Sequence, residues 1–122
     1  MPIGKFLAAV IDCKDPNSLS DFWQSILGGE KDPRTETTEW VALSGVPELG
    51  YLGFQKVPEL KTVKNRVHLD IDVEAIDDAV THAVSLGASV VGKVVEEVTN
   101  YFQVMTDPEG NEFCFILRKN NK

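Results

Sequence analysis

The chain has 122 residues, of which 43% are hydrophobic, and this is enough for the core of one globular domain. Its formal net charge of −7 argues against binding to nucleic acid, because a phosphate backbone attracts basic surfaces. The apolar run at the N-terminus is too short for a signal peptide or a membrane span, and no later segment is long enough. Cys13 and Cys114 have neither CxxC nor zinc-finger spacing, so we expect buried thiols in a cytoplasmic protein.

The first half of the chain predicts a strand, a helix and three further strands. Asp15 and Pro16 follow an apolar strand and provide the N-cap and the first residue of a helix. Apolar residues at helical spacing form one stripe, which includes Phe22 and Trp23, and Gly28 ends the helix. A polar segment then predicts a short edge strand and a loop before two more strands. The expected elements span residues 6–13, 16–27, 30–39, 40–44 and 50–57.

The second half predicts the same order of elements after a charged linker at residues 58–65. Residues 64–73 alternate apolar and polar side chains, which is typical of a strand with one buried face. We expect the buried face to carry Val67, Leu69, Ile71 and Val73, and the other face to carry Arg66, His68, Asp70 and Asp72. The later elements are a helix at 75–86, strands at 88–95, 100–106 and 112–117, and a tight turn at 107–111.

The two halves can be aligned as an internal repeat. A shift of 60 residues places Ala8 on His68, and a shift of 61 pairs Phe54 with Phe115 and Val41 with Phe102. We interpret residues 5–57 and 66–118 as two βαβββ modules in one α+β domain that spans residues 1–122. Two such modules in tandem are expected to form a curved mixed sheet with the helices outside and a concave pocket.

The alternation of side chains along each strand predicts which residues line the concave face. Trp40 and Tyr101 come from strands that we align as equivalent, so they are expected to form aromatic walls for a flat or apolar ligand; the alternatives are ordinary packing or a dimer interface. Such a mixture of aromatic and polar groups is typical of small-molecule pockets. The predicted lining comprises Ala8, Val10, Trp40, Ala42, Tyr51, Gly53, Gln55, His68, Asp70, Asp72, Tyr101, Gln103, Glu112 and Cys114.

Several short motifs resemble the vicinal oxygen chelate superfamily, which includes glyoxalase I, bleomycin-resistance proteins and extradiol dioxygenases. The chain is most similar to the glyoxalase-like domain branch, and the resemblance covers essentially the whole chain. The most specific motif is Asp-Pro-Glu-Gly-Asn at residues 107–111. The others are Asp15-Pro16, Phe22-Trp23, Leu27-Gly28, His68-Leu69-Asp70 and Leu86-Gly87-Ala88.

The resemblance also implies where a divalent ion is bound in the metal-dependent members, which use inward histidine and glutamate residues from both modules. Carried over, those positions are Ala8, Gly53, His68 and Cys114, and only His68 is of the usual ligand type. We therefore predict that the inherited metal site is lost and that there is no cofactor. A site rebuilt from His68, Cys114 and Glu112 would favour zinc or another divalent ion, but Glu112 emerges two residues away from Cys114.

The polar face and the resemblance together predict a small-molecule binding protein of the bleomycin-resistance type, which forms a homodimer and binds neither nucleic acid nor membrane. The alternatives are a lyase, isomerase or dioxygenase-type enzyme, and a structural or regulatory module. The enzyme would use His68 with a non-standard metal site or an acid–base pair. Otherwise His68 is a relic of metal binding that is hydrogen-bonded to Asp70 or a tyrosine. The candidate ligand-binding residues are His68, Asp70, Trp40, Tyr101, Gln55, Glu112 and Cys114.

Overall fold

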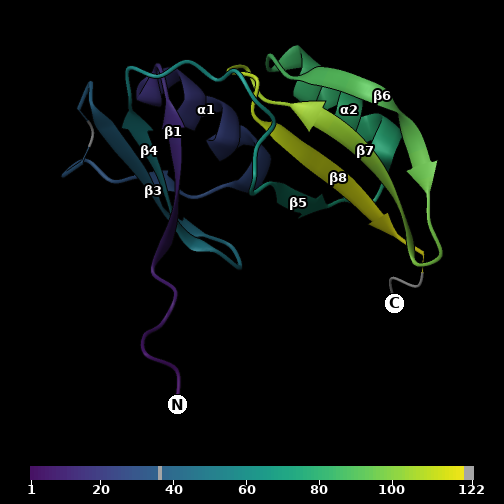
Figure 1. Ribbon diagram of the computed structural model, residues 1–122, viewed down its shortest axis with the longest axis horizontal. Coiled ribbons are helices and arrows are strands. Elements are labelled where there is room, and N and C mark those ends of the chain that lie inside the picture. Colours follow the sequence, from purple (N-terminus) through teal and green to yellow (C-terminus); the bar gives the residue numbers. More distant parts are fainter. Residues whose placement is uncertain (36, 120–122) are drawn as a thin grey trace. The chain divides into compact units, whose positions relative to one another are not determined.

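The computed structural model describes residues 1–35 and 37–119. The chain divides into two compact units, Met1–Leu60 and Lys61–Lys122, which we call unit 1 and unit 2. Each unit contains one helix that lies against one face of a four-stranded mixed sheet, as Figure 1 shows. This arrangement confirms the predicted α+β fold built from two repeated modules. No helix in the described part of the chain is long and apolar enough to cross a membrane.

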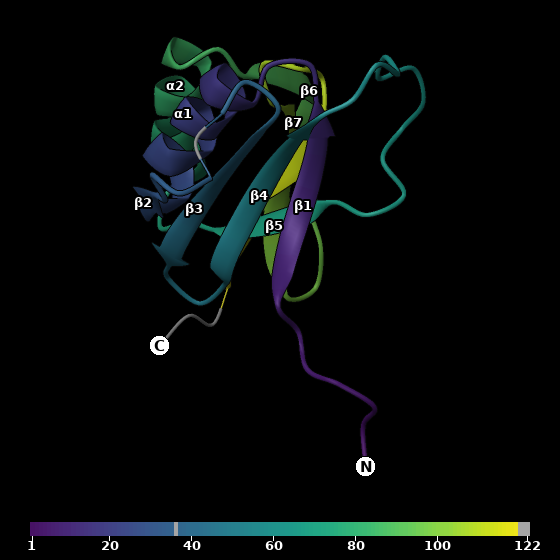
Figure 2. The same ribbon diagram turned by 90° about the vertical axis from the view of Figure 1, so that its left-hand side faces the viewer.

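Unit 1 begins with a strand and a capped helix. Asp15 accepts a hydrogen bond from the backbone N–H of Ser18 at 3.2 Å, with Pro16 as the first helical residue, as predicted. In the sheet, strand β1 runs parallel to β4, and β3 lies between β4 and β2, as Figure 2 shows. The elements are β1 (Ala8–Cys13), α1 (Pro16–Leu27), β2 (Glu30–Lys31), β3 (Trp40–Val46) and β4 (Gly50–Lys56).

The core of unit 1 forms between α1 and one face of the sheet. Phe22 and Trp23 pack edge to face with ring centroids 5.3 Å apart, and Trp23 is only 1% exposed. The predicted apolar stripe of the helix is therefore core. Burial of each large apolar side chain stabilises the fold by about 1.5–3 kcal/mol. The sheet contributes alternate residues that are fully buried, namely Val41, Leu43, Leu52 and Phe54.

Unit 2 repeats this topology. Strand β5 runs parallel to β8, and the strand order β5-β8-β7-β6 corresponds to β1-β4-β3-β2 of unit 1. Phe113, Phe115 and Met105 are buried on the face that α2 covers. The elements are β5 (Leu69–Asp72), α2 (Ile76–Ser85), β6 (Ser89–Glu96), β7 (Asn100–Thr106) and β8 (Glu112–Arg118).

The strand registers confirm the repeat at its centre and correct it at one strand. Val10 lies opposite Gly53 in unit 1, and Asp70 lies opposite Cys114 in unit 2, which matches the predicted shifts of 60 and 61. Across the next strand pair, however, Gly53 lies opposite Ala42, whereas Cys114 lies opposite Val104, so the shift is 62. The predicted pairing of Val41 with Phe102 is thus wrong by one residue. A one-residue change in register moves every side chain of the strand to the other face.

Strand β5 is shorter than predicted and only half-buried. It spans Leu69–Asp72 rather than residues 64–73, and Val67 is 81% exposed. The reason is that β8 begins at Glu112, which leaves the residues before Leu69 without a partner strand. Leu69 and Ile71 alternate with Asp70 as predicted, but they are only partly covered, because β5 is the edge strand of its sheet.

Strand β6 is the other edge of this sheet. Its pairing with β7 shifts register between Val91 and Val95, and Gly92 adopts a positive φ of 74° in the bulge. The buried Gln103 amide donates hydrogen bonds to the carbonyl oxygens of Val91 and Gly92, both at 3.2 Å. Gln103 is opposite Phe115, so it lies on the helix-covered face and not on the predicted concave face. The exposed valines of β6 are Val90, Val91, Val94 and Val95.

The turn that precedes β8 is held by one buried carboxylate. Asp107 accepts hydrogen bonds from the backbone N–H of Glu109 at 2.9 Å and of Asn111 at 3.0 Å. Gly110 provides the positive φ of 88° that the turn requires. The tight turn predicted at residues 107–111 is confirmed, and it fixes where β8 starts.

Candidate functional site

In each unit, one face of the sheet is turned away from that unit's own helix, and we call it the helix-free face. In unit 1 the register places Val10, Trp40, Gly53 and Gln55 on this face. The Trp40 ring lies directly over the backbone of Gly53. A Cβ atom added to Gly53 would lie 2.5 Å from Cη2 and 2.9 Å from Cζ2 of this ring. Only glycine at this position leaves room for the indole.

The residues of unit 1 do not fit the metal site that the family resemblance implies. Ala8 and Gly53 carry no donor atom, and the Trp40 ring fills the space that a side chain at Gly53 would need. A catalytic ion requires about three protein ligands. The helix-free face of unit 1 therefore offers an aromatic surface with an exposed amide, Gln55, directly opposite Trp40.

The helix-free face of unit 2 brings together three of the predicted site residues. Asp70 and Cys114 lie directly opposite each other on the parallel strands β5 and β8. His68 comes just before β5, and its Nε2 lies 3.3 Å from Oδ1 of Asp70. One donor atom from each of the three residues lies within 4.8 Å of the other two. We call this group the His68–Asp70–Cys114 cluster.

The environment of Cys114 keeps its side chain in the thiol form at neutral pH. Burial is the main cause that raises the pKa of this thiol, and the negative charge of Asp70 raises it further, against a smaller opposite effect of Lys64. An unassisted thiolate nucleophile is therefore not favoured here. Deprotonation would require a positive charge close to the sulfur.

Glu112 is positioned for a structural role rather than for the cluster. Its carboxylate accepts a hydrogen bond from the backbone N–H of Asn65 at 2.9 Å and forms an ion pair with Lys61 at 3.1 Å. The hydrogen bond from Asn65 is the main cause that lowers the pKa of Glu112, with help from Lys61. The carboxylate thus holds the linker of unit 2 against the start of β8.

Tyr101 lies on the opposite face from the one predicted. It is opposite Leu117, in the same alternation as Phe113 and Phe115, so it shares the helix-covered face. The residue equivalent to Trp40 is Phe102. The ammonium group of Lys119 lies 5.0 Å from the centre of the Tyr101 ring. Trp40 and Tyr101, which were expected to form an aromatic pair, therefore do not lie on equivalent faces of their units.

A charge pair in the loop after β2, formed by a buried carboxylate and an exposed arginine, was not predicted. Asp32 is only 6% exposed, and its two carboxylate oxygens accept from Nε and a terminal nitrogen of Arg34 at 3.0 and 2.7 Å. The Tyr51 hydroxyl lies 3.5 Å from the same carboxylate. These contacts lower the pKa of Asp32 to about 2, with the Arg34 hydrogen bond as the main cause. In the sequence, Asp32 and Arg34 are two residues apart in a polar loop. This spacing does not distinguish an ion pair from unpaired loop charges.

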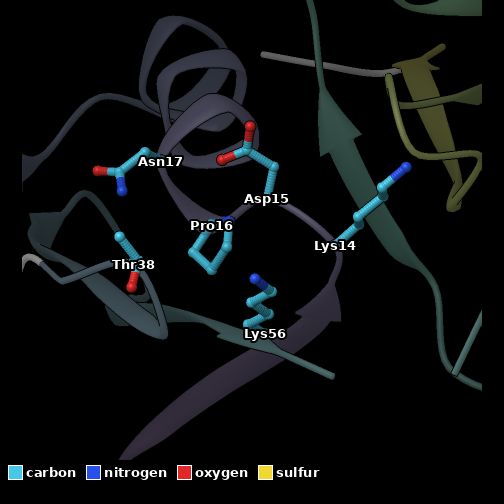
Figure 3. A pocket seen from close by; sticks show the side chains of 6 residues that line it. All are labelled: Lys14, Asp15, Pro16, Asn17, Thr38 and Lys56. Atoms are coloured by element: carbon cyan, nitrogen blue, oxygen red, sulfur yellow. The ribbon is translucent and has the colours of Figure 1, made fainter. Parts of the chain in front are cut away.

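A surface pocket of about 370 Å³ lies at the N-terminal end of α1. Figure 3 shows Lys56 beside Pro16, with Lys14 and Asp15 on the loop that leads into the helix. Asp15 already caps the helix, so its N-terminal N–H groups are partly satisfied. No predicted site residue lines this pocket. Its lining residues are Lys14, Asp15, Pro16, Asn17, Thr38 and Lys56.

Similar folds are known from several bacteria. A glyoxalase/bleomycin resistance protein/dioxygenase family enzyme from Burkholderia phytofirmans has a TM-score of 0.75 and 21% identity, covering 91% of this chain and 96% of its own. The fosfomycin resistance protein FosX from Listeria monocytogenes has a TM-score of 0.74 and 14% identity, covering 98% and 97%. A FosX variant complexed with Mn(II) and 1S,2S-dihydroxypropylphosphonic acid has a TM-score of 0.74 and 15% identity, covering 94% and 90%.

A family model also matches the amino-acid sequence of this chain. The model of the glyoxalase-like domain matches residues 8–116, which cover most of both repeated modules. A comparison with curated proteins gave no match. The resemblance to the vicinal oxygen chelate superfamily is confirmed. The chain belongs to the glyoxalase-like domain family.

Proposed function

We propose that this protein binds a small molecule, in the manner of the glyoxalase/bleomycin-resistance type, and that the family's four-position metal site is lost. The observation that carries the proposal is the Trp40 ring, which lies against Gly53 and is half-buried. A ring held in place by the backbone gives contact area at little cost in conformational entropy. Its remaining surface is suited to a flat or apolar ligand.

Polar groups beside this wall would orient the ligand. Gln55 is exposed and lies directly opposite Trp40 in the sheet, so its amide can donate to and accept from a ligand. Val10 is 47% exposed on the same face and extends the apolar surface. A few polar groups next to an apolar wall are the usual composition of small-molecule sites.

Tryptophan fluorescence tests the proposal directly, with bleomycin as the probe. Trp23 is 1% exposed, so a ligand that binds from solvent can quench the fluorescence of Trp40 but not that of Trp23 by direct contact. We expect saturable quenching in the wild type, and weaker binding measured by calorimetry in both Trp40→Ala and Gln55→Ala. Trp40→Phe keeps an aromatic wall and should retain binding measured by calorimetry. Unchanged affinity in Trp40→Ala, or no saturable binding at all, would contradict the proposal for this probe.

We propose a homodimer in which strand β6 pairs with β6 of a second copy. The support is that β6 is an edge strand with four exposed valines. Its sequence, Ser-Val-Val-Gly-Lys-Val-Val-Glu, has the same valine pattern in both directions, so antiparallel pairing about a two-fold axis would place valine opposite valine. Sedimentation should show a dimer for the wild type, a monomer for Val91→Glu and a dimer for the control Val98→Glu, which changes an exposed valine outside β6. A dimeric Val91→Glu variant would exclude this interface.

The second candidate function is an enzyme of the lyase, isomerase or dioxygenase type that uses His68. The observation in its favour is the 3.3 Å distance between His68 and Asp70, which suits a histidine oriented by a carboxylate for proton transfer. The assay would offer the hemithioacetal of methylglyoxal and glutathione, and catechol with oxygen. Turnover that is abolished by His68→Ala and reduced by Asp70→Asn would favour the enzyme; no turnover of either probe would favour the binding protein.

A further inference from the structure

We propose that the His68–Asp70–Cys114 cluster binds one divalent ion of the zinc class, with all its protein ligands from unit 2. This site differs from the one that the family resemblance implies, because it takes nothing from unit 1 and uses Asp70, which is not one of the inherited positions. It also differs from the rebuilt site considered from the sequence, because Asp70 replaces Glu112. The proposal goes beyond ligand binding at Trp40 and does not depend on it.

The backbone already holds two of the three ligands side by side. Asp70 and Cys114 are directly opposite each other on adjacent parallel strands, which are about 4.8 Å apart in any sheet. His68 lies two residues before Asp70 and therefore points to the same side, where its Nε2 lies 3.3 Å from the carboxylate. No long loop has to close for the three donors to meet.

The donor distances are close to those that a tetrahedral ion requires. With bonds of about 2.0–2.3 Å, donors on one zinc ion lie roughly 3.3–3.8 Å apart. The three donor atoms here lie within 4.8 Å of one another, so no separation has to close by more than about 1.5 Å. The His68 and Asp70 side chains are 47% and 59% exposed, so they are free to rotate by that amount.

The neighbouring carboxylates are occupied by cations, whereas Asp70 is not. Arg118 forms two hydrogen bonds with Asp72, at 3.1 and 2.8 Å, and Lys61 pairs with Glu112. Among the described residues, only His68 lies within ion-pair distance of Asp70. The strand therefore presents one carboxylate without a lysine or arginine partner, next to an imidazole and a thiol.

The combination of donors selects the ion. Nitrogen, oxygen and sulfur donors together suit Zn²⁺ or Co²⁺, whereas Mg²⁺ and Mn²⁺ prefer oxygen-rich sites. On binding, the Cys114 thiol loses its proton to solvent and the sulfur becomes a thiolate ligand. Three protein ligands and an exposed side leave the fourth position open to water or to an oxygen of a ligand, which the ion would polarise.

Cobalt titration of untagged protein tests the site with a spectroscopic signal that needs no enzymatic activity. We expect one Co²⁺ per chain, a thiolate-to-cobalt charge-transfer band, and displacement of Co²⁺ by Zn²⁺ but not by Mn²⁺. Cys114→Ser should abolish the charge-transfer band. His68→Ala and Asp70→Asn should each weaken binding by at least the roughly 10–100-fold that loss of a supporting contact costs at metal sites.

Two matched controls separate this site from adventitious binding. His82→Ala removes an exposed histidine on α2 that has Asp78 four residues before it, and Cys13→Ser removes the buried thiol of unit 1. Both variants should bind Co²⁺ as the wild type does. The proposal is overturned if folded Cys114→Ser keeps the band, if His68→Ala binds as tightly as the wild type, if Mn²⁺ displaces Zn²⁺, or if no stoichiometric binding occurs. Bleomycin quenching at Trp40 is measured without metal, so either proposal can fail alone.

Discussion

The two units share one topology but carry different chemistry on their helix-free faces. Where unit 1 has Ala8 and Gly53, unit 2 has His68 and Cys114 at the aligned positions. The helix-covered faces, by contrast, keep the same kind of residue, with Phe54 in unit 1 and Phe115 in unit 2. In both units the helix-covered face packs against a helix, so its residues must stay apolar. The helix-free face has no such constraint, and its residues can differ between the units. On this face unit 1 carries the Trp40 ring, and unit 2 carries the His68–Asp70–Cys114 cluster.

The largest effect is expected from the faces that the units have in common. Phe54→Ala and Phe115→Ala each remove a buried ring from equivalent positions, and each should lower the free energy of unfolding by about 3–5 kcal/mol, because both leave a cavity against a helix. Urea unfolding followed by circular dichroism measures both. If one of the two variants lost less than about 1 kcal/mol, the two cores would not be equivalent and the comparison would fail.

The next effect distinguishes the helix-free faces. Gly53→Ala places a methyl group against the Trp40 ring and should lower stability by about 1–3 kcal/mol. The same measurement on Cys114→Ala, at the aligned position of unit 2, serves as the control and should give a smaller loss. Adding Trp40→Ala to Gly53→Ala should remove most of the penalty in a double-mutant cycle. An additive pair would show that the ring does not lie on the glycine in solution.

Acid should destabilise unit 1 through Asp32. Its folded pKa of about 2 is below the ordinary value of 3.8, so its contribution to stability is present above pH 3.8 and is lost as the pH falls toward 2. Asp32→Asn should flatten the dependence of unfolding free energy on pH in this window. Asp72→Asn in unit 2 is the control, because the Asp72 and Arg118 side chains are both more than half exposed and solvent screens their ion pair. Equal pH profiles for the wild type and Asp32→Asn would refute the role of the Asp32 carboxylate.

The smallest expected effect on stability concerns the linker of unit 2. Glu112→Ala removes the acceptor for the Asn65 N–H and the partner of Lys61, and the partly exposed ion pair is worth about 1 kcal/mol or less. The linker should nevertheless open more often, so trypsin should cleave after Lys61 or Lys64 faster than in the wild type. Glu109→Ala, which changes a nearby carboxylate side chain, is the control. Unchanged cleavage in Glu112→Ala would mean that other contacts hold the linker.

Much of the fold follows from local pattern, and the pattern also predicted all three cluster residues as site residues. The stripe of α1, the Asp15 cap and the alternation of Phe113 and Phe115 are each visible within a few residues, because burial on one face imposes a period on the sequence. The repeat alignment placed His68 and Cys114 at inherited positions, and alternation placed Asp70 on the face of His68. These are relations within one element or between equivalent elements.

Contacts that depend on strand pairing were beyond the sequence. The face of Tyr101 was predicted wrongly because the register of β7 depends on the turn before β8, and one residue of slip reverses the face. The length of β5 was overestimated because its partner strand begins only at Glu112. The tertiary structure alone decided that the Trp40 ring lies on Gly53, that Glu112 holds the linker, and that one donor atom each of His68, Asp70 and Cys114 lies within 4.8 Å of the other two. Each of these contacts joins separate segments whose distance is set by hydrogen bonding between strands and not by any local pattern.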